Sequence, residues 1–229
     1  MFRRENVSMQ RFFDIVFSGI GLVLLSPLLV PLLFVLRVTG EGEIFFIQKR
    51  VGRGGKHFKL YKFATMLKDS PKMDLGTLTV KNDPRVLPIG VLLRKTKINE
   101  LPQLINIFKG DMSIIGPRPQ TQRCFDAFPV VSQNQIIKVR PGLSGIGSII
   151  FRNEEDMMHA NNDPDKFYDE IVMPYKGALE EWYVSYQSIG SYFIIIGLTF
   201  WVVLGLSSGL VWKSFEDLPA PPEELSNWM

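Results

Sequence analysis

The 229-residue sequence predicts a mostly helical α/β protein held at a membrane. Three observations predict this fold class: residues 15–36 carry no charge, residues 43–66 have strand-turn-strand character, and residues 85–109 place apolar side chains at helical spacing. We divide the chain into residues 1–40, a membrane segment; residues 41–188, a compact domain; residues 189–213, an apolar helix; and residues 214–229, a loose tail.

The composition excludes several classes of protein. The formal net charge is +3, so the chain lacks the dense basic stripe that binds nucleic acid. The single cysteine, Cys124, excludes an internal disulfide and a cysteine-rich zinc site, and we expect a small, partly buried residue there. His57 and His159 are the only histidines, which argues against a histidine-based triad or metal cluster.

The apolar run from Ile15 to Leu36 exceeds the roughly 18 residues that predict a membrane-crossing helix. It is long for a cleaved signal peptide, and no small-residue cleavage site follows it. Pro27 lacks an N–H and its ring crowds the carbonyl of Val23, so we expect a kink there. The Ser26 hydroxyl is placed to satisfy a carbonyl that the kink sets free.

Cations flank both ends of this run: Arg3, Arg4 and Arg11 before it, and Arg37, Lys49, Arg50 and Arg53 after it. Positively charged flanks favour the cytoplasmic side, so both flanks favour the same side. A helix that enters the bilayer, bends at Ser26-Pro27 and leaves by the same face satisfies both. On the residues alone, a plain span that contains proline is an equal alternative.

The segments after the membrane run combine a hairpin with helices. A glycine-rich turn at residues 52–55 between alternating segments predicts the hairpin. Apolar spacing predicts a helix over residues 85–97 and another over residues 100–109, capped by Asn99 and ended by Gly110.

The remaining segments are assigned from composition. Residues 68–83 are polar and predict a loop, and residues 163–182 predict a helix interrupted at Pro174. Residues 192–212 are long and nearly uncharged, so a second membrane span is one interpretation. The tail is rich in proline and acidic residues, which is typical of a loose segment.

Residues 95–120 concentrate the side chains that phosphate chemistry needs. Cations and helix N-terminal amides neutralise phosphoryl oxygens, and a carboxylate such as Glu100 or Asp111 holds Mg²⁺ or attacks phosphorus. Each carboxylate also has a purely structural interpretation, because acids favour the first turn of a helix and aspartate favours turns. The cations nearby in the sequence are Arg94, Lys95, Lys97 and Arg118, with Lys62 on the hairpin and Arg140 at a Pro-Gly turn as weaker signals.

Taken in order, seven motifs resemble the monotopic phosphoglycosyl transferases, bacterial sugar transferases that start lipid-linked glycan assembly. The resemblance covers nearly the whole chain, and the ordered combination of motifs is highly specific. The motifs are Ser26-Pro27 in the membrane segment, QKRVG at 48–52, FKLYKFATM at 58–66, NDPRV at 82–86, ELPQL at 100–104, GDMSIIGPRP at 110–119 and RPGLSG at 140–145.

The resemblance implies a re-entrant helix in one leaflet and a catalytic domain with interfacial helices on the cytoplasmic face of the inner membrane. It implies Mg²⁺-assisted transfer of a phosphosugar from a UDP-sugar, by way of an aspartate adduct, to polyprenyl phosphate, with release of UMP, in polysaccharide or exopolysaccharide biosynthesis. The expected partners are the UDP-sugar, polyprenyl phosphate and membrane lipids, without nucleic acid; a homo-oligomer stays open. By the same implication, residues 189–213 pack at the interface.

The resemblance places Asn99 and Glu100 at the catalytic and Mg²⁺-binding positions. By charge and motif position, we assign the substrate and its phosphates to Lys62, Arg94, Asp111, Arg118 and Arg140.

Asn99 departs from the family, which has an aspartate before the Glu-Leu-Pro-Gln-Leu run. An asparagine amide is neutral and poorly nucleophilic. Four interpretations stay open. The enzyme uses Glu100 or Asp111 as the nucleophile, it transfers directly with both substrates bound, it carries an introduced substitution, or it is a catalytically silent relative that binds lipid phosphate or partner transferases.

Overall fold

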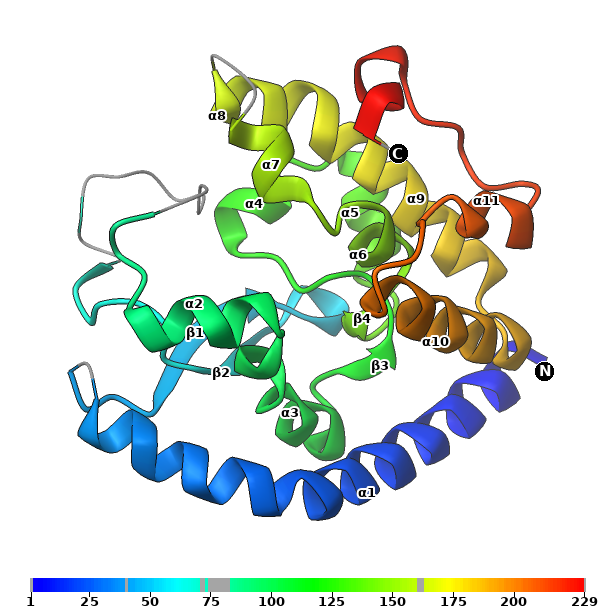
Figure 1. The fold of residues 1–229 in the computed structure, drawn as a ribbon. Coiled ribbons are helices and arrows are strands. Elements are labelled where there is room, and N and C mark those ends of the chain that lie inside the picture. Colours follow the sequence, from blue (N-terminus) through cyan, green and yellow to red (C-terminus); the bar gives the residue numbers. More distant parts are fainter. Residues whose placement is uncertain (1, 40, 71–72, 74–82, 160–162, 229) are drawn as a thin grey trace.

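The structure, a computed structural model, describes residues 2–39, 41–70, 73, 83–159 and 163–228. Two small β-sheets lie between the long N-terminal helix on one side and the C-terminal helices on the other (Figure 1). The helices are α1 (Phe2–Val38), α2 (Pro88–Lys95), α3 (Gln103–Lys109), α4 (Gln122–Asp126), α5 (Val130–Ile136), α6 (Ile146–Ile150), α7 (Glu154–His159), α8 (Pro164–Phe167), α9 (Met173–Tyr186), α10 (Ile189–Val203) and α11 (Leu210–Ser214).

The two sheets have two strands each. Strand β1 (Phe45–Val51) pairs antiparallel with β2 (His57–Phe63), from Phe45 opposite Phe63 to Val51 opposite His57. The turn between them contains Gly54 and Gly55 at φ of 69° and 71°, as the predicted hairpin requires. The second sheet pairs β3 (Ser113–Ile115) with β4 (Gly142–Ser144) in parallel.

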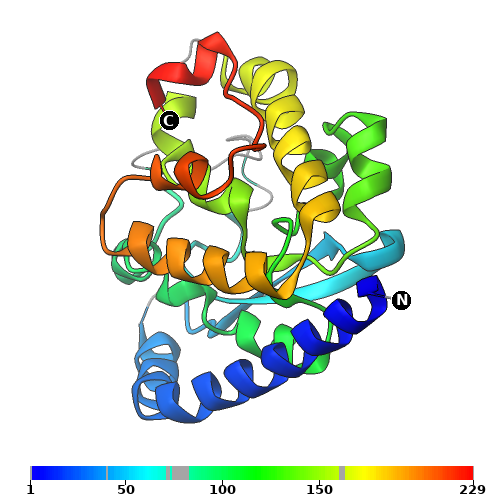
Figure 2. The same cartoon turned by 90° about the vertical axis from the view of Figure 1, so that its right-hand side faces the viewer.

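Helix α1 is long and apolar enough to cross a membrane between Val7 and Val38, and 6% of its most apolar window is buried. Figures 1 and 2 show that it bends in its middle, with the rest of the protein on the concave side of the bend. Ser26 Oγ donates to the carbonyl of Val23 at 2.7 Å, the bond that the sequence predicted beside Pro27. The Ser26 hydroxyl therefore gives the Val23 carbonyl the hydrogen bond that Pro27, which has no N–H, cannot give. Helix α1 continues through this proline.

Buried polar side chains attach α1 to the rest of the protein. Asp14 is 1% exposed, and its Oδ1 accepts hydrogen bonds from Ser113 Oγ (3.0 Å), the backbone N–H of Ile114 (2.9 Å) and Tyr192 Oη (3.0 Å). Gln10 adds a bond from Nε2 to Ser113 Oγ at 2.8 Å. These contacts fix the N-terminal arm of α1 against β3 and α10.

The segment before α3 differs from the predicted helix. A 3-10 turn, η3 (Ile98–Glu100), precedes α3, and Lys97 adopts the left-handed conformation at φ 59°. Asn99 is therefore buried inside this turn, and the prediction that it caps the helix is wrong. Gly110, at φ 97°, ends α3 as predicted.

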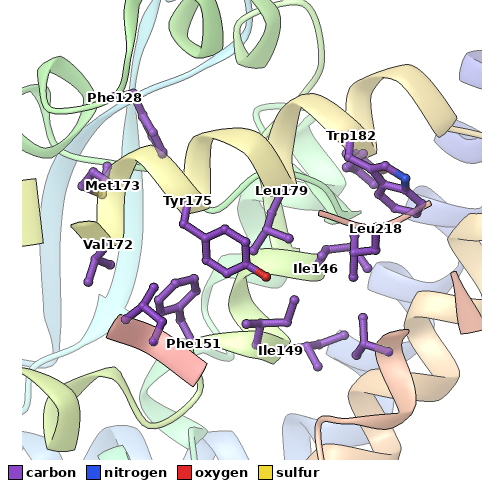
Figure 3. Close-up of a cluster of buried hydrophobic side chains, with 14 of the residues drawn as sticks. Phe128, Ile146, Ile149, Phe151, Val172, Met173, Tyr175, Leu179, Trp182 and Leu218 are labelled. Carbon is purple, nitrogen blue, oxygen red and sulfur yellow. The ribbon is translucent and has the colours of Figure 1, made fainter. Parts of the chain in front are cut away.

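The predicted helix over residues 163–182 runs as three consecutive segments: α8, the π-helical turn η4 (Tyr168–Val172) and α9. Pro174 lies in the first turn of α9, so the irregular turn precedes it. Figure 3 shows α9 crossing the largest apolar core, where Leu179 and Trp182 point towards Ile146, Ile149 and Leu218. Cys124 is buried in this core, as expected.

The prediction that the C-terminal tail is loose is wrong, because the tail packs against the rest of the protein. Leu218 and Leu225 are 6% and 0% exposed, and a 3-10 turn, η5 (Glu223–Trp228), forms despite the prolines and acids. The carbonyl of Pro219 accepts a bond from Tyr175 Oη at 2.9 Å. The two leucines bury enough apolar surface to hold a segment whose average composition favours disorder.

The last apolar segment is shorter than the run that suggested a second span. Helix α10 has 15 residues and is followed by Gly205 at φ 84°. At about 1.5 Å per residue it is roughly 22 Å long, less than the roughly 30 Å of a hydrocarbon core. The predicted loop over residues 68–83 lies largely outside the described residues.

Candidate active site

Glu100 lies at the centre of a compact group of charges, at the end of η3. Its Oε1 accepts bonds from Lys62 Nζ on β2 at 3.1 Å and from Arg118 Nη2 in the loop after β3 at 3.2 Å. The Glu100 side chain is 13% exposed, whereas Arg118 keeps 38% exposure. Three segments distant in sequence thus bring one carboxylate and two of the predicted phosphate-binding cations together.

The charges in this group shift one another's pKa values. Burial alone would raise the pKa of the Glu100 carboxyl, but Lys62, Arg118 and Lys97 together hold that pKa well below its ordinary value. Burial lowers the pKa of Lys62 to about 8, an effect that Glu100 opposes. The pKa of Arg118 is raised by Glu100. Near neutral pH the group is therefore one carboxylate and two cations, with a net positive charge.

Asn99 lies directly beside this group and is 7% exposed. Its Oδ1 is buried and has no hydrogen-bond partner within the described parts of the chain. Buried carbonyl oxygens are nearly always paired, so an unpaired one marks a place where a donor or a cation fits.

Arg118 is positioned by close backbone contact between two of the motifs. A Cβ on Gly116 would lie 2.5 Å from the carbonyl oxygen of Arg140, and a Cβ on Gly142 would lie 2.1 Å from the nitrogen of Gly116. Only glycine allows the segments before Pro117 and after Pro141 to approach this closely. The GPRP and RPGLSG motifs therefore meet at one place and project Arg118 towards Glu100.

Arg50 lies beside this group of charges, although it is not among the site residues predicted from the sequence. Its guanidinium donates to the carbonyl of Pro119 at 3.1 Å and to Gln48, and its Nε is buried without a partner among the described residues. Burial, and then the like charge of Arg118, lowers the pKa of Arg50 to about 10. The sequence feature that could have indicated Arg50 as a site residue is the QKRVG motif, in which Lys49 and Val51 flank it.

A second layer of buried charge lies behind Arg118. Lys176 is paired with Glu154 and stands 4.7 Å from the ring centre of Phe151. Burial raises the pKa of Glu180 to about 7, and its main opposing interaction is with the backbone N–H of Arg118. These groups, which no motif predicted, support the loop that carries Arg118.

Asp111 lies at the other end of α3 from Glu100. The seven-residue helix separates the two ends by about 10 Å. Asp111 Oδ2 accepts a bond from Asn106 Nδ2 at 3.2 Å. Asn106 is fully buried and also bonds Lys59 O (2.7 Å) and Tyr61 N (3.1 Å), so it docks α3 onto β2.

The other two predicted phosphate-binding residues also contact other parts of the protein. Arg140 Nε donates to the carbonyl of Gly110 at 2.9 Å, beside Asp111. Arg94 on α2 has Nη1 3.9 Å from Met66 Sδ and lies near Asp83, whose pKa it helps to lower. The predicted site is therefore spread along α3, with Lys62, Asn99, Glu100 and Arg118 at one end.

The chemistry of Asn99 and Glu100 fits Mg²⁺. Mg²⁺ takes oxygen ligands and is often held by one or two protein oxygens together with substrate phosphates. Asn99 Oδ1 is an unpaired buried carbonyl oxygen, and Glu100 supplies a carboxylate. No cluster of three or more histidine, cysteine or acidic side chains that could hold a metal ion occurs among the described residues, so a bound Mg²⁺ would need further oxygen ligands such as water or phosphate.

The long, exposed, apolar helix α1 indicates association with a membrane, and the Glu100 group combines one buried carboxylate with two cations. The chain belongs to the bacterial sugar transferase family, whose family model matches residues 5–206.

Several curated proteins are similar to this chain. The "Exopolysaccharide production protein ExoY" of Rhizobium meliloti is 33% identical over 162 residues, which cover 63% of this chain and 70% of that protein. The "Undecaprenyl-phosphate galactose phosphotransferase" of Salmonella typhimurium is 32% identical over 221 residues, 88% of this chain and 42% of that protein. A "Putative undecaprenyl-phosphate N-acetylgalactosaminyl 1-phosphate transferase" of Bacillus subtilis is 44% identical over 114 residues, 50% of this chain and 63% of that protein. The chain thus spans less than two thirds of the last two relatives.

Proposed function

We propose that this protein transfers a phosphosugar from a UDP-sugar to polyprenyl phosphate at the cytoplasmic face of the inner membrane. The products are a polyprenyl diphosphate-sugar, the first intermediate of a lipid-linked glycan, and UMP. The observation that carries the proposal is the contact of Lys62 and Arg118 with Glu100 beside the unpaired oxygen of Asn99. The names of the relatives, which act on undecaprenyl phosphate, support the same reaction class.

The cations of the site match the charge of the substrate. A UDP-sugar carries two negative charges on its diphosphate, and polyprenyl phosphate adds more. Lys62 and Arg118 place two positive charges within 3.2 Å of one carboxylate oxygen, and Arg50 lies behind them. Fixed cations in a partly buried site stabilise the charge that builds up on phosphoryl oxygens during transfer.

Asn99 cannot carry a phosphosugar as an aspartate does, so we propose direct transfer. An oxygen of polyprenyl phosphate attacks the β-phosphorus, which bears the sugar; the bond from that phosphorus to the bridging oxygen breaks, and UMP leaves with this oxygen. Glu100 is engaged by two cations, so its role is to position them. Bound Mg²⁺, held through Asn99 and Glu100, would supply further charge neutralisation.

The bend of α1 supports a re-entrant geometry. The helix is exposed and apolar, with Val23 and Leu24 71% and 72% exposed near the bend. Its two arms rise towards the same side of the molecule (Figure 1). With the middle in one leaflet, both arms return to the surface where the catalytic domain lies.

A second candidate function follows from Asn99. A silent relative would bind UDP-sugar or lipid phosphate without turnover and would recruit partner transferases. The observation behind this candidate is that Asn99 has no carboxylate at the position where the family carries its nucleophile.

One assay separates the two. Purified full-length protein in vesicles is given radiolabelled UDP-sugars and polyprenyl phosphate, in parallel with an Asn99→Asp variant. The proposal expects lipid-linked product from the unmodified chain and no covalent phosphosugar on the protein by mass spectrometry. If only the Asn99→Asp variant forms product, the chain is silent. A phosphosugar adduct on Glu100 or Asp111 would reject direct transfer.

A further inference from the structure

A second concentration of positive charge lies away from Glu100, beside the N-terminal arm of α1. A pocket there is lined by Arg11 on α1, Arg53 in the hairpin turn, and Lys138 and Arg140 before β4. Arg140 contacts the carbonyl of Gly110, at the end of α3 opposite to Glu100. Figure 2 shows the hairpin turn next to the N-terminal end of α1.

Two backbone hydrogen bonds bring three of these cations together. The N–H of Gly54 donates to Ile137 O at 2.7 Å, which brings Arg53 and Lys138 to the same place. The N–H of Ser113 donates to Pro141 O at 2.9 Å and places Arg140 beside β3. Three elements of the domain and α1 therefore meet at a pocket that the fold defines.

The pocket carries an excess of positive charge, because four cations and one carboxylate, Asp14, line it. None of the four cations forms an ion pair with any residue that the structure describes. Arg11 donates to the carbonyls of Ile107 and Phe108. Asp14, which also lines the pocket, is 1% exposed and already accepts three hydrogen bonds through one oxygen.

The electrostatics of Arg140 agree with this geometry. Burial lowers the pKa of Arg140, the like charges of Arg53 and Arg11 lower it further, and Asp14 opposes them without reversing the direction. An anion in the pocket would relieve this repulsion.

The pocket lies at the edge of the apolar surface of α1. Arg11 precedes the charge-free run, and its neighbours Met9, Phe12 and Ile15 are 47%, 60% and 40% exposed. Cations at the end of a membrane helix lie at the depth of lipid headgroups, and basic pockets there bind anionic headgroups. Acyl chains would cover the exposed apolar side chains, a contact that a free phosphate ion cannot make.

We propose that this pocket binds the phosphate headgroup of one anionic phospholipid and so holds the N-terminal arm of α1 at the membrane surface. The inference rests on the membrane placement of α1 in the proposed function but not on the transfer reaction. The lipid is a structural ligand here, separate from the polyprenyl phosphate at Glu100.

Native mass spectrometry of the full chain in detergent tests the proposal without any UDP-sugar, so its outcome is independent of transferase activity. Phosphatidylglycerol is titrated onto three proteins: the unmodified chain, an Arg53→Gln/Lys138→Gln variant, and a Lys166→Gln/Lys213→Gln control. All four substituted residues are exposed, and both pairs remove two charges. We expect one tightly held lipid on the unmodified chain and the control, and binding about tenfold or more weaker on the first variant.

Four results would overturn the proposal. They are equal binding to the Arg53→Gln/Lys138→Gln variant, an equal loss in the control, equal binding of zwitterionic phosphatidylcholine, and displacement of phosphatidylglycerol by inorganic phosphate or glycerol phosphate at similar concentrations. The last would assign the pocket to a soluble phosphate instead of a lipid.

Discussion

Lys62 Nζ lies 3.1 Å from Glu100 Oε1, although the two residues are 38 positions apart. Asn106 makes this contact possible, because its side chain bonds the backbone of Lys59 and Tyr61 on β2 and so docks α3 beside the strand. The site therefore depends on a buried amide with no chemical role.

Replacing Arg118 with glutamine removes the more exposed cation of the site. We expect kcat/KM for UDP-sugar to fall by about 10²–10³, because a fixed charge aimed at the transferring phosphoryl group is lost. The Arg123→Gln variant is the matched control, since Arg123 is also ion-paired, but with Asp165 of α8 and Asp169 of η4 instead of Glu100. An equal loss in both variants would remove Arg118 from the chemistry.

We expect the charge of Lys62 to set the upper pH limit of transferase activity. Burial lowers its pKa to about 8, so it is charged below that pH and loses its charge as the pH rises above it. We expect kcat/KM, which reports the free enzyme, to decline above about pH 8. In a Lys62→Arg variant that retains activity, the decline should move to higher pH, because arginine stays protonated.

The Lys59→Arg variant is the control for that pH profile, since Lys59 is an exposed residue of the same strand. It should leave the pH limit where it is. A pH limit that does not move in the Lys62→Arg variant would assign the titration to another group.

The bend of α1 predicts that both of its ends face the cytoplasm. Accessible tags at the N-terminus and after residue 40 should therefore report the same side of the membrane. A Ser26→Leu/Pro27→Leu variant removes the kink and the Ser26–Val23 bond, so a fraction of its molecules should show the second tag on the opposite side. A Pro31→Leu control should keep the original topology, and opposite sides in the unmodified protein would establish a plain span.

The packed tail predicts a stability effect far from the site. Leu225 is fully buried, so Leu225→Ala should lower the free energy of unfolding by about 2–5 kcal/mol. The thermal midpoint in detergent should fall by at least about 4 °C. Val130→Ala, at a residue that is 70% exposed, should change it little. An unchanged midpoint in Leu225→Ala would mean that the tail detaches in solution.

Local pattern was enough to predict the hairpin, the end of α3 at Gly110 and the Ser26 bond beside Pro27, because each depends on residues adjacent in sequence. Charge and motif position also indicated Lys62, Glu100 and Arg118. The sequence did not predict that these three side chains meet, because their meeting requires Asn106 to dock α3 on β2 and Gly116 and Gly142 to let two loops approach closely.

The wrong predictions share one physical cause, which is tertiary packing. Asn99 has the side chain of a helix cap, but the left-handed Lys97 turns it into the interior. The tail has the composition of a disordered segment, yet two leucines find places in the core. The role of Asp111 in substrate binding stays a prediction, and the seven-residue α3 places it at the opposite end of that helix from Glu100.

The hydrogen bonds of Asp14 have a consequence for biosynthesis. Its partners follow it by 99, 100 and 178 residues, so the ribosome makes the carboxylate long before it makes the groups that satisfy it. Asp14 therefore lacks its full set of hydrogen-bond donors until Tyr192 has been translated. The contact between α1 and α10 through Asp14 and Tyr192 therefore cannot form before residue 192 has been made, so α1 reaches its final place only after most of the domain has been synthesised.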